Sequence, residues 1–170
     1  MSVFDTEPRP PVHTPPETAD RPRTLAEAKE WMLDRTRRSI HPMNNTSLED
    51  VTTVLADLNG LDPVSWAAAW RGAGESAWDI AEGTEDPAAR RDAFLRAQGL
   101  FFMGRFPCPN HPDKLASAER ERDAYLAAGA LMDPPVERIT VPFDGGTDAH
   151  GDEVVFYLRR PAGVVDPPVV

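Results

Sequence analysis

The sequence DPPVERITVPF (residues 133–143) divides the chain into a helical part and a part with strand periodicity. Pro134 and Pro135 end any helix that precedes them, because proline cannot continue the backbone hydrogen-bond ladder. Residues 136–143 then show the alternating pattern, rich in β-branched residues, that is typical of a strand. The stretch therefore predicts a mainly helical domain followed by a sheet.

A second strand is predicted beyond this boundary. The turn signal DGG (144–146) is followed by DEVVFYLRRP (152–161), which predicts a strand antiparallel to the first. PPVV (167–170) has the pattern of the start of a third strand. An isolated two-stranded hairpin is only marginally stable. We therefore expect the sheet to be completed by further residues of the same protein or by a second chain.

Five helices are predicted before the boundary. Thr24 and Ser47 are N-cap residues, and Asp62 and Asp86 each precede a proline at the first helical position. Gly60 has the position of a left-handed C-cap. The helices are expected at about 24–39, 47–59, 62–80, 86–104 and 112–132.

Hydrophobic spacing predicts which faces of these helices are buried. Gly72 and Gly74 lie inside the third helix and predict a kink there, because glycine is a poor helix former. The residues expected to point inward are Trp66, Trp70, Ala73, Ala77 and Ile80 on the third helix and Leu115, Ala118, Tyr125, Leu126 and Gly129 on the fifth.

Composition narrows the class of protein. The 170 residues are 41% hydrophobic and 27% charged, as in soluble domains, and carry a formal net charge of −10. Such acidity gives the chain no electrostatic reason to bind nucleic acid or an anionic membrane. It contains neither a secretory signal nor a run of about 18 apolar residues. We therefore expect a cytoplasmic protein that binds neither nucleic acid nor membranes.

Proline is unevenly distributed. Six of the 18 prolines lie within residues 1–23, where apolar residues are scarce. Burial there cannot offset the entropy lost on ordering. The expected organisation is a disordered proline-rich tail at 1–23, a helical domain at 24–133 and the first strands of a truncated sheet at 134–170.

Side chains suited to catalysis are sparse. The single cysteine, Cys108, excludes an internal disulfide and a multi-cysteine zinc site, and its neighbour His111 lies with it in a proline-rich loop. The acidic loop at 144–153 lacks the spacing of a calcium loop. Neither a Gly-x-Ser-x-Gly elbow nor a phosphate-binding loop occurs. We expect no catalytic residue, metal ion or cofactor within this chain.

Aromatic residues are concentrated on the third and fourth helices. They could line an apolar pocket between the helices, although aromatic residues at helical spacing occur more often in a plain core. Arg96 and Arg105 flank them, either as paired structural groups or as groups that face a pocket. Spacing alone does not choose between these alternatives.

A series of motifs follows in order from Trp66 to Val170. It consists of Trp66 and Trp70 in one helix, FLRAQGLFFMGRFP (94–107), DAYLAAGALMDPPVERITVPFDGG (123–146), and DEVVFYLRRPAG (152–163) leading into PPVV (167–170). In order and spacing the series resembles the N-terminal portion of the esterase-like α/β-hydrolases grouped with the fermentation–respiration switch protein. The same group includes 2,6-dihydroxypseudooxynicotine hydrolase and fungal pigment-pathway hydrolases that shorten polyketides.

The resemblance implies a fold and a role. In that family a helical cap precedes the sheet, so the expected fold is a mainly α N-terminal cap followed by the first β-hairpin of an α/β-hydrolase sheet, an incomplete α/β domain. The family's catalytic serine, acid and histidine follow the third strand, so none has a counterpart here. The cap would shape the substrate pocket and exclude water. The residues expected to bind substrate are Trp66, Trp70, Phe101, Phe102, Arg105 and Phe106.

Two functions of different classes follow. The first is the cap and first strands of a serine α/β-hydrolase that cleaves an ester or an activated carbon–carbon bond in a small, ester-like or β-diketone-like substrate. Its triad would come from the remaining hydrolase core, in cis or as a second chain. The second is a non-catalytic helical protein that pairs with a partner through its open strand edge. A homodimer is compatible with either function.

Overall fold

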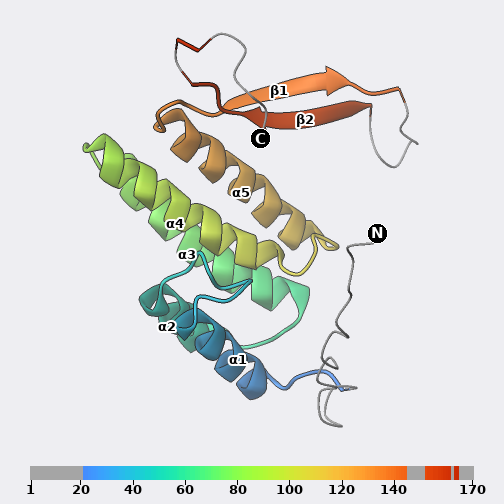
Figure 1. Cartoon of the computed structure of the whole chain (residues 1–170). Helices are drawn as coiled ribbons and strands as arrows, with labels where there is room; N and C mark the ends of the chain where they lie inside the picture. The colour runs from blue at the N-terminus through green and yellow to red at the C-terminus, as the bar shows by residue number, and fades with distance from the viewer. Residues whose placement is uncertain (1–20, 145–151, 162, 165–170) are drawn as a thin grey trace, which may run out of the picture.

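The computed structural model describes residues 21–144, 152–161 and 163–164 (Figure 1). These residues form five helices and one two-stranded antiparallel sheet, which confirms the predicted fold class of a helical domain followed by a hairpin. Residues 1–20 of the predicted tail and the predicted third strand lie outside the described residues. The elements are α1 (Leu25–Arg37), α2 (Leu48–Asp57), α3 (Pro63–Gly83), α4 (Pro87–Arg105), α5 (Pro112–Ala130), β1 (Glu137–Pro142) and β2 (Glu153–Leu158).

Capping groups in the local sequence set the starts of the helices. The Thr24 hydroxyl accepts a hydrogen bond from the Glu27 backbone N–H, and the Glu27 carboxylate accepts one from the Thr24 N–H, which completes a capping box. Asp62, Asp86 and His111 accept first-turn N–H bonds of α3, α4 and α5, each of which begins with proline. The predicted starts of these helices are therefore confirmed.

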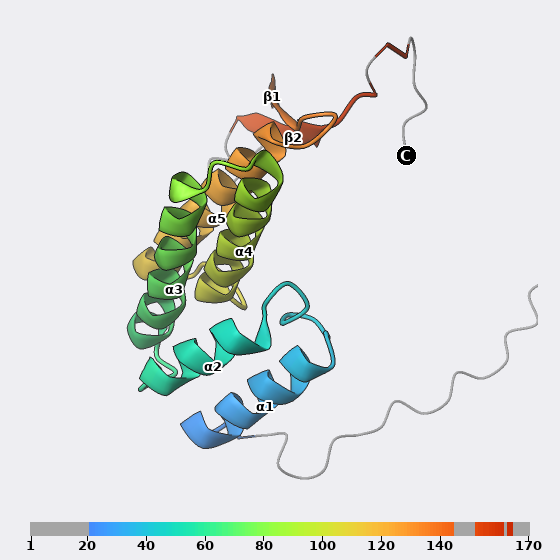
Figure 2. The same cartoon turned by 90° about the vertical axis from the view of Figure 1, so that its left-hand side faces the viewer.

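The helices pack as a single unit. Helices α3, α4 and α5 lie side by side, with α1 and α2 on one side of this layer and the hairpin on the other (Figures 1 and 2). All five helices contribute to one hydrophobic core. Its largest fully buried apolar side chains are Trp70, Phe101, Met32, Met43, Leu58, Leu100, Met103 and Val51.

A glycine allows α3 and α4 to approach each other closely. A Cβ atom on Gly74 would lie 2.5 Å from the ring of Phe101, nearer than such atoms can come. Phe101 is fully buried in this contact. The two glycines were expected to kink or break the helix; a break is wrong, because α3 is one uninterrupted α-helix in which Gly74 serves the packing.

Two positions predicted to point inward are wrong. Ile80 is 52% exposed and Leu115 is 50% exposed. The buried face of α3 runs through Ala77 and Ala81, and a residue one position away is rotated from that face by about 100°. Leu115 lies two positions from the buried Ser117 of α5, which turns it by about 200°. Both are apolar side chains on the solvent-facing side of a helix.

The end of α2 also differs from the prediction. Gly60 does not adopt a left-handed conformation; among the glycines of the described residues, positive φ occurs at Gly163. The helix ends at Asp57, and its C-cap residue Leu58 has extended backbone, with φ −66° and ψ 114°. This turns the Leu58 side chain into the core, where it is 2% exposed. Burial of a leucine, and not glycine's freedom, ends this helix.

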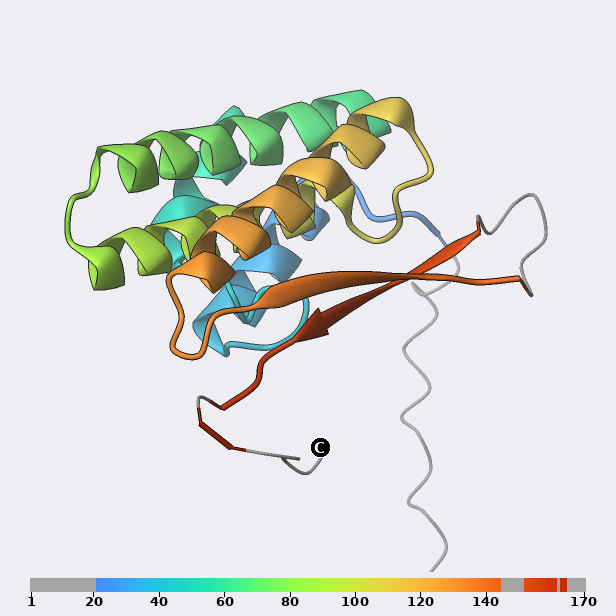
Figure 3. The same ribbon diagram turned by 90° about the horizontal axis from the view of Figure 1, so that it is seen from above.

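The hairpin presents an apolar face to solvent. The two strands run antiparallel (Figure 3). Ile139 of β1 is paired with Phe156 of β2, and Val141 lies two residues along on the same face. Phe156 is 52% exposed and Val141 is 43% exposed. On the opposite face, Tyr157 packs edge-to-face on Tyr125 of α5, with 5.4 Å between the ring centroids. One face of the hairpin thus contacts the helical domain, and the other is uncovered in the described structure.

Three contacts fix the connection between α5 and β1. A Cβ atom on Gly129 would lie 2.7 Å from the Val136 Cβ, so the chain doubles back closely onto the end of α5. The Arg159 guanidinium, at the end of β2, donates hydrogen bonds to the carbonyl oxygens of Asp133 and Pro134 at 3.1 and 3.0 Å. These contacts hold the base of the hairpin against the last turn of α5.

Replacing Gly74 with alanine is expected to lower the free energy of unfolding by about 1–3 kcal/mol, because the new methyl group must displace the Phe101 ring. Gly72→Ala is the matched control, since a Cβ atom at Gly72 meets nothing within 4 Å. It should be neutral or stabilise the fold by up to about 1 kcal/mol, because alanine favours the helix. Urea denaturation followed by circular dichroism measures both; equal effects would contradict the contact.

Candidate functional site

Three of the residues predicted to bind substrate, Trp66, Trp70 and Phe101, lie in the helical core. Trp70 and Phe101 are fully buried, and Trp66 is 9% exposed. The Trp66 indole Nε1 donates a hydrogen bond to the Met103 carbonyl oxygen at 2.6 Å. The rings of Trp66 and Trp70 lie together with centroids 5.9 Å apart. This group forms the packed interface between α3 and α4.

The other three, Phe102, Arg105 and Phe106, lie together at the end of α4 and are partly exposed. The rings of Phe102 and Phe106 are 6.1 Å apart. His41, from the loop after α1, lies edge-on to both, at 6.0 and 6.2 Å. The Arg105 guanidinium lies 4.7 Å from the Phe102 ring centroid, within cation–π distance. The structure therefore separates the six predicted residues into a buried group and a surface group.

The surface group is linked through Arg105 to a polar pocket between α4, α5 and β2, which we call the junction pocket, although none of its three residues lines that pocket. Arg105 forms an ion pair with Glu121 of α5, and the Gln98 side-chain amide donates to the same carboxylate at 3.2 Å. The pocket has a volume of about 230 Å³. Its lining residues are Gln98, Ala118, Glu121, Arg122, Tyr125 and Tyr157.

Sequence reasoning did not identify Gln98, Glu121 or Tyr157 as members of a site. Gln98 lies two turns before Arg105, so the two share one face of α4, and this spacing is the one signal the sequence offers. Glu121 and Tyr157 meet that face only because α5 packs beside α4 and β2 crosses α5. Their contribution depends on tertiary structure, which the local pattern does not encode.

The chemistry of the junction pocket is that of binding. Its carboxylate, amide, guanidinium and two phenol groups can hydrogen-bond a polar ligand beside aromatic rings. His111, the histidine near Cys108, caps α5 by accepting a hydrogen bond from the Asp113 N–H at 3.3 Å. Over the described ranges, no three His, Cys, Asp or Glu side chains are grouped to hold a metal ion. None of the described helices is long and apolar enough to cross a membrane.

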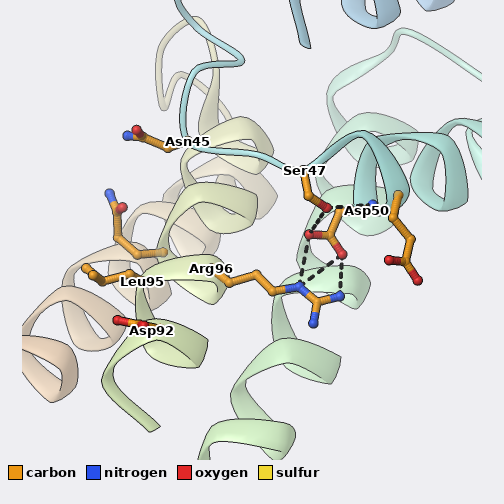
Figure 4. A pocket seen from close by; sticks show the side chains of 8 residues that line it. Asn45, Ser47, Asp50, Asp92, Leu95 and Arg96 are labelled. Carbon is orange, nitrogen blue, oxygen red and sulfur yellow. Dashed lines mark hydrogen bonds and ion pairs between the residues drawn. The ribbon is translucent and has the colours of Figure 1, made fainter. Parts of the chain in front are cut away.

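A larger pocket, of about 650 Å³, lies between the start of α2 and α4 (Figure 4). Its central feature is an ion pair in which the Arg96 Nε donates to both carboxylate oxygens of Asp50, at 3.0 and 2.9 Å. The Ser47 hydroxyl donates to the same carboxylate at 2.7 Å. Arg96 therefore fits both alternatives that the sequence left open: it is a paired group that joins α4 to α2, and it lines this pocket.

The Asp50 carboxyl has a shifted pKa. Burial raises it, but hydrogen bonds from Arg96 and Ser47 outweigh burial and hold the pKa below the ordinary value of 3.8. A carboxyl whose pKa falls on folding stabilises the protein above its unfolded-state pKa, and this contribution is lost as the pH falls through the folded-state value. The ion pair thus contributes fully at neutral pH and progressively less below about pH 4.

Removing Arg96 should lower the free energy of unfolding more than removing the charge of Asp50. Arg96→Met leaves the Asp50 carboxylate, whose side chain is 6% exposed, without its cation, and should cost about 2–4 kcal/mol at pH 7. Asp50→Asn leaves a guanidinium that is 45% exposed and should cost about 1 kcal/mol.

The difference between these two variants should shrink between pH 7 and pH 4, because an unpaired buried carboxyl is protonated more readily. Urea denaturation at both pH values measures it. If Asp50→Asn lowers the free energy of unfolding at pH 7 more than Arg96→Met does, Arg96 does not compensate the buried charge of Asp50.

Comparison with known proteins adds the chemical context. No protein-family profile matches the chain. It is similar to hydrolase ORFZ of Pyricularia oryzae (34% identity over 106 residues), hydrolase LUC6 of Fusarium sp (30% over 106) and 20-hydroxy-prefusarin hydrolase FUS2 of Gibberella moniliformis (28% over 109). The alignments cover 57%, 59% and 61% of this chain but 25%, 25% and 26% of these relatives, so the chain spans about a quarter of their length. The chain is a distant homologue of proteins named hydrolases.

Proposed function

We propose that the chain is the cap and first two strands of a serine α/β-hydrolase that cleaves an ester or an activated carbon–carbon bond. In this proposal the Ser-His-acid triad belongs to a hydrolase core outside the chain, later in the same protein or in a second chain. The observation that carries the proposal is the homology to several proteins named hydrolases, at 28–34% identity. The order of helical domain and hairpin supports it, because it matches the expected cap and first strands.

The hairpin supports the same proposal. Strand β2 is apolar on both faces, with Val154 and Phe156 on alternate positions from Val155 and Tyr157. Strands with apolar residues on both faces are typical of α/β sheets that are covered on both sides. On the face turned away from α5, Phe156 is 52% exposed and Val141 of β1 is 43% exposed. A hydrolase core that continues the sheet from this hairpin would bury them.

The junction pocket and the surface group beside it provide the cap's substrate-facing residues in this proposal. Phe102, Arg105 and Phe106 are partly exposed at the end of α4, where the two rings lie beside His41 and Arg105 pairs with Glu121 of the junction pocket. Trp70 and Phe101 lie behind them in the core. A small ester-like or β-diketone-like substrate would pack against the rings. Closure of the cap would exclude water and strengthen the electrostatic stabilisation of the reacting carbonyl.

A non-catalytic binding function is the second candidate, and the edges of the hairpin favour it. Among the described residues, β1 and β2 pair only with each other. Each strand therefore presents an edge with unpaired backbone groups, and such an edge can accept a strand from another chain. The partner would be another protein, or a second copy of this chain in a homodimer.

A fluorophosphonate probe separates the two functions, because it labels an activated serine whatever the substrate. The natural full-length protein should contain a Gly-x-Ser-x-Gly elbow, react with the probe and turn over p-nitrophenyl esters or a β-diketone. The 170-residue chain should do neither, and substituting the elbow serine with alanine should abolish labelling. A full-length protein without the elbow, or with the elbow but without labelling, would overturn the hydrolase proposal and favour the binding function.

The adjacent Phe101 and Phe102 provide a matched pair for testing the cap's role. Phe102→Ala in the full-length protein should change the ratio of kcat/KM between short and long acyl esters by about tenfold and leave the enzyme folded. Phe101→Ala should cost about 3–5 kcal/mol of stability, because it empties a fully buried position. Kinetics and thermal unfolding measure the two effects. A Phe102→Ala enzyme that unfolds, or that keeps its selectivity, would contradict a role in binding substrate.

A further inference from the structure

Helices α1, α3 and α5 begin at one end of the helical domain (Figure 1). A further cavity lies among these helix starts. We call it the helix-start pocket. Its volume is about 230 Å³, and it shares no lining residue with the junction pocket. The lining residues that matter here are Arg23, Trp31, Met32, Trp66, Phe106 and Lys114.

Lys114 is a buried cation in the wall of this pocket. The residue is 8% exposed, and lysine is almost never buried without a partner. Its Nζ donates one hydrogen bond, to the Phe106 carbonyl oxygen at 2.9 Å, and an ammonium group has three N–H donors. Among the described residues no carboxylate lies within ion-pair distance of it. The wall of the pocket therefore contains a positive charge that no described side chain neutralises.

The acidic side chains at the starts of the three helices have other partners. Glu27 pairs with Arg21 and caps α1, Asp62 caps α3, and Asp113 lies near Arg71 and His111. None of the three acids lines the pocket. The amino ends of helices also carry a partial positive charge from their aligned peptide dipoles. The charged residues that line the pocket are therefore both cations, Arg23 and Lys114.

The remaining wall of the helix-start pocket is apolar and aromatic. The Trp31 ring lies 5.0 Å from the Arg23 guanidinium, which is the second cation of the lining. Met32 is fully buried, and the Trp66 ring and Phe106 supply further apolar surface. The volume is below the range of about 300–1,000 Å³ that holds drug-sized ligands. The pocket thus suits a ligand with a single ring.

We infer that the helix-start pocket binds a small aromatic carboxylate. The carboxylate would accept hydrogen bonds from the free N–H donors of Lys114 and from Arg23, whose fork geometry matches a carboxylate. The ring would pack on Trp31, Trp66 and Phe106. This site shares no lining residue with the junction pocket, but it shares Phe106 with the surface group of the proposed cap. It needs no hydrolase core, and its test measures binding to the 170-residue chain, so either inference can fail without the other.

Benzoate is the probe for this inference, with benzamide as its neutral isostere and acetate as the charge without the ring. Each is titrated into the ¹⁵N-labelled 170-residue chain while the indole N–H resonances are followed by NMR. We expect saturable shifts of Trp31 and Trp66 with benzoate, with an affinity at least about tenfold above that for benzamide or acetate. Trp78, which packs on Phe94 at a different place, serves as the internal control and should not shift.

Lys114→Gln retains a donor for the Phe106 carbonyl oxygen but removes the charge, and should weaken benzoate binding about tenfold. Lys29→Gln removes the only other lysine of the chain, which lies outside the pocket, and should leave binding unchanged. If Lys114→Gln does not fold, Arg23→Gln, before the start of α1, should weaken binding about threefold.

Three results would overturn the inference. The first is an equal affinity for benzoate and benzamide. The second is benzoate binding that is not weakened by Lys114→Gln or, if that variant does not fold, by Arg23→Gln. The third is a shift of the Trp78 resonance as large as that of Trp31.

Discussion

Phe101 projects from α4 into the space left by the missing side chain of Gly74 on α3, and the packing of the helical domain is arranged around this contact. The Arg120 guanidinium of α5 lies 5.2 Å from the same ring and 4.2 Å from that of Trp78, and it pairs with Glu75 of α3. Three helices are thus joined at one buried phenylalanine. Because interiors are close-packed, a change of even one methyl group at this point is transmitted to all three.

Much of this fold was predictable because its signals are local. The Asp62-Pro63 and Asp86-Pro87 pairs place a capping oxygen and a preset φ at neighbouring positions, which determines where a helix starts whatever surrounds it. The glycine in α3 was not predictable in the same way. Glycine destabilises a helix by up to about 1 kcal/mol. At Gly74 the packing of Phe101 in the space of the missing side chain outweighs this cost. Because Phe101 lies on another helix, the sequence around Gly74 does not reveal it. Ile80 was wrongly predicted to point inward for a related reason. It borders the apolar stripe of α3, and only the neighbouring helix determines where the buried face ends.

The same distinction separates the two kinds of site residue. The aromatic residues of α3 and α4 were visible in the sequence, but nothing in their spacing distinguishes the buried Phe101 from the partly exposed Phe102, which is rotated by about 100°. Arg96 and Arg105 looked alike, yet one is held by Asp50 from α2 and the other by Glu121 from α5. Lys114 carried no sequence signal, because its isolation from carboxylates is a property of three helix starts that converge in space.

The base of the hairpin is held to the helical domain at the last turn of α5, through Gly129 and Val136 and through the Arg159 guanidinium. The Tyr157 ring packs on Tyr125 one turn earlier, so both attachments of the hairpin lie in the second half of α5. The helix begins at Pro112, beside Lys114, and Lys114 lies roughly 20 Å along the helix axis from Gly129. A ligand bound among the helix starts would therefore leave the attachment of the hairpin undisturbed.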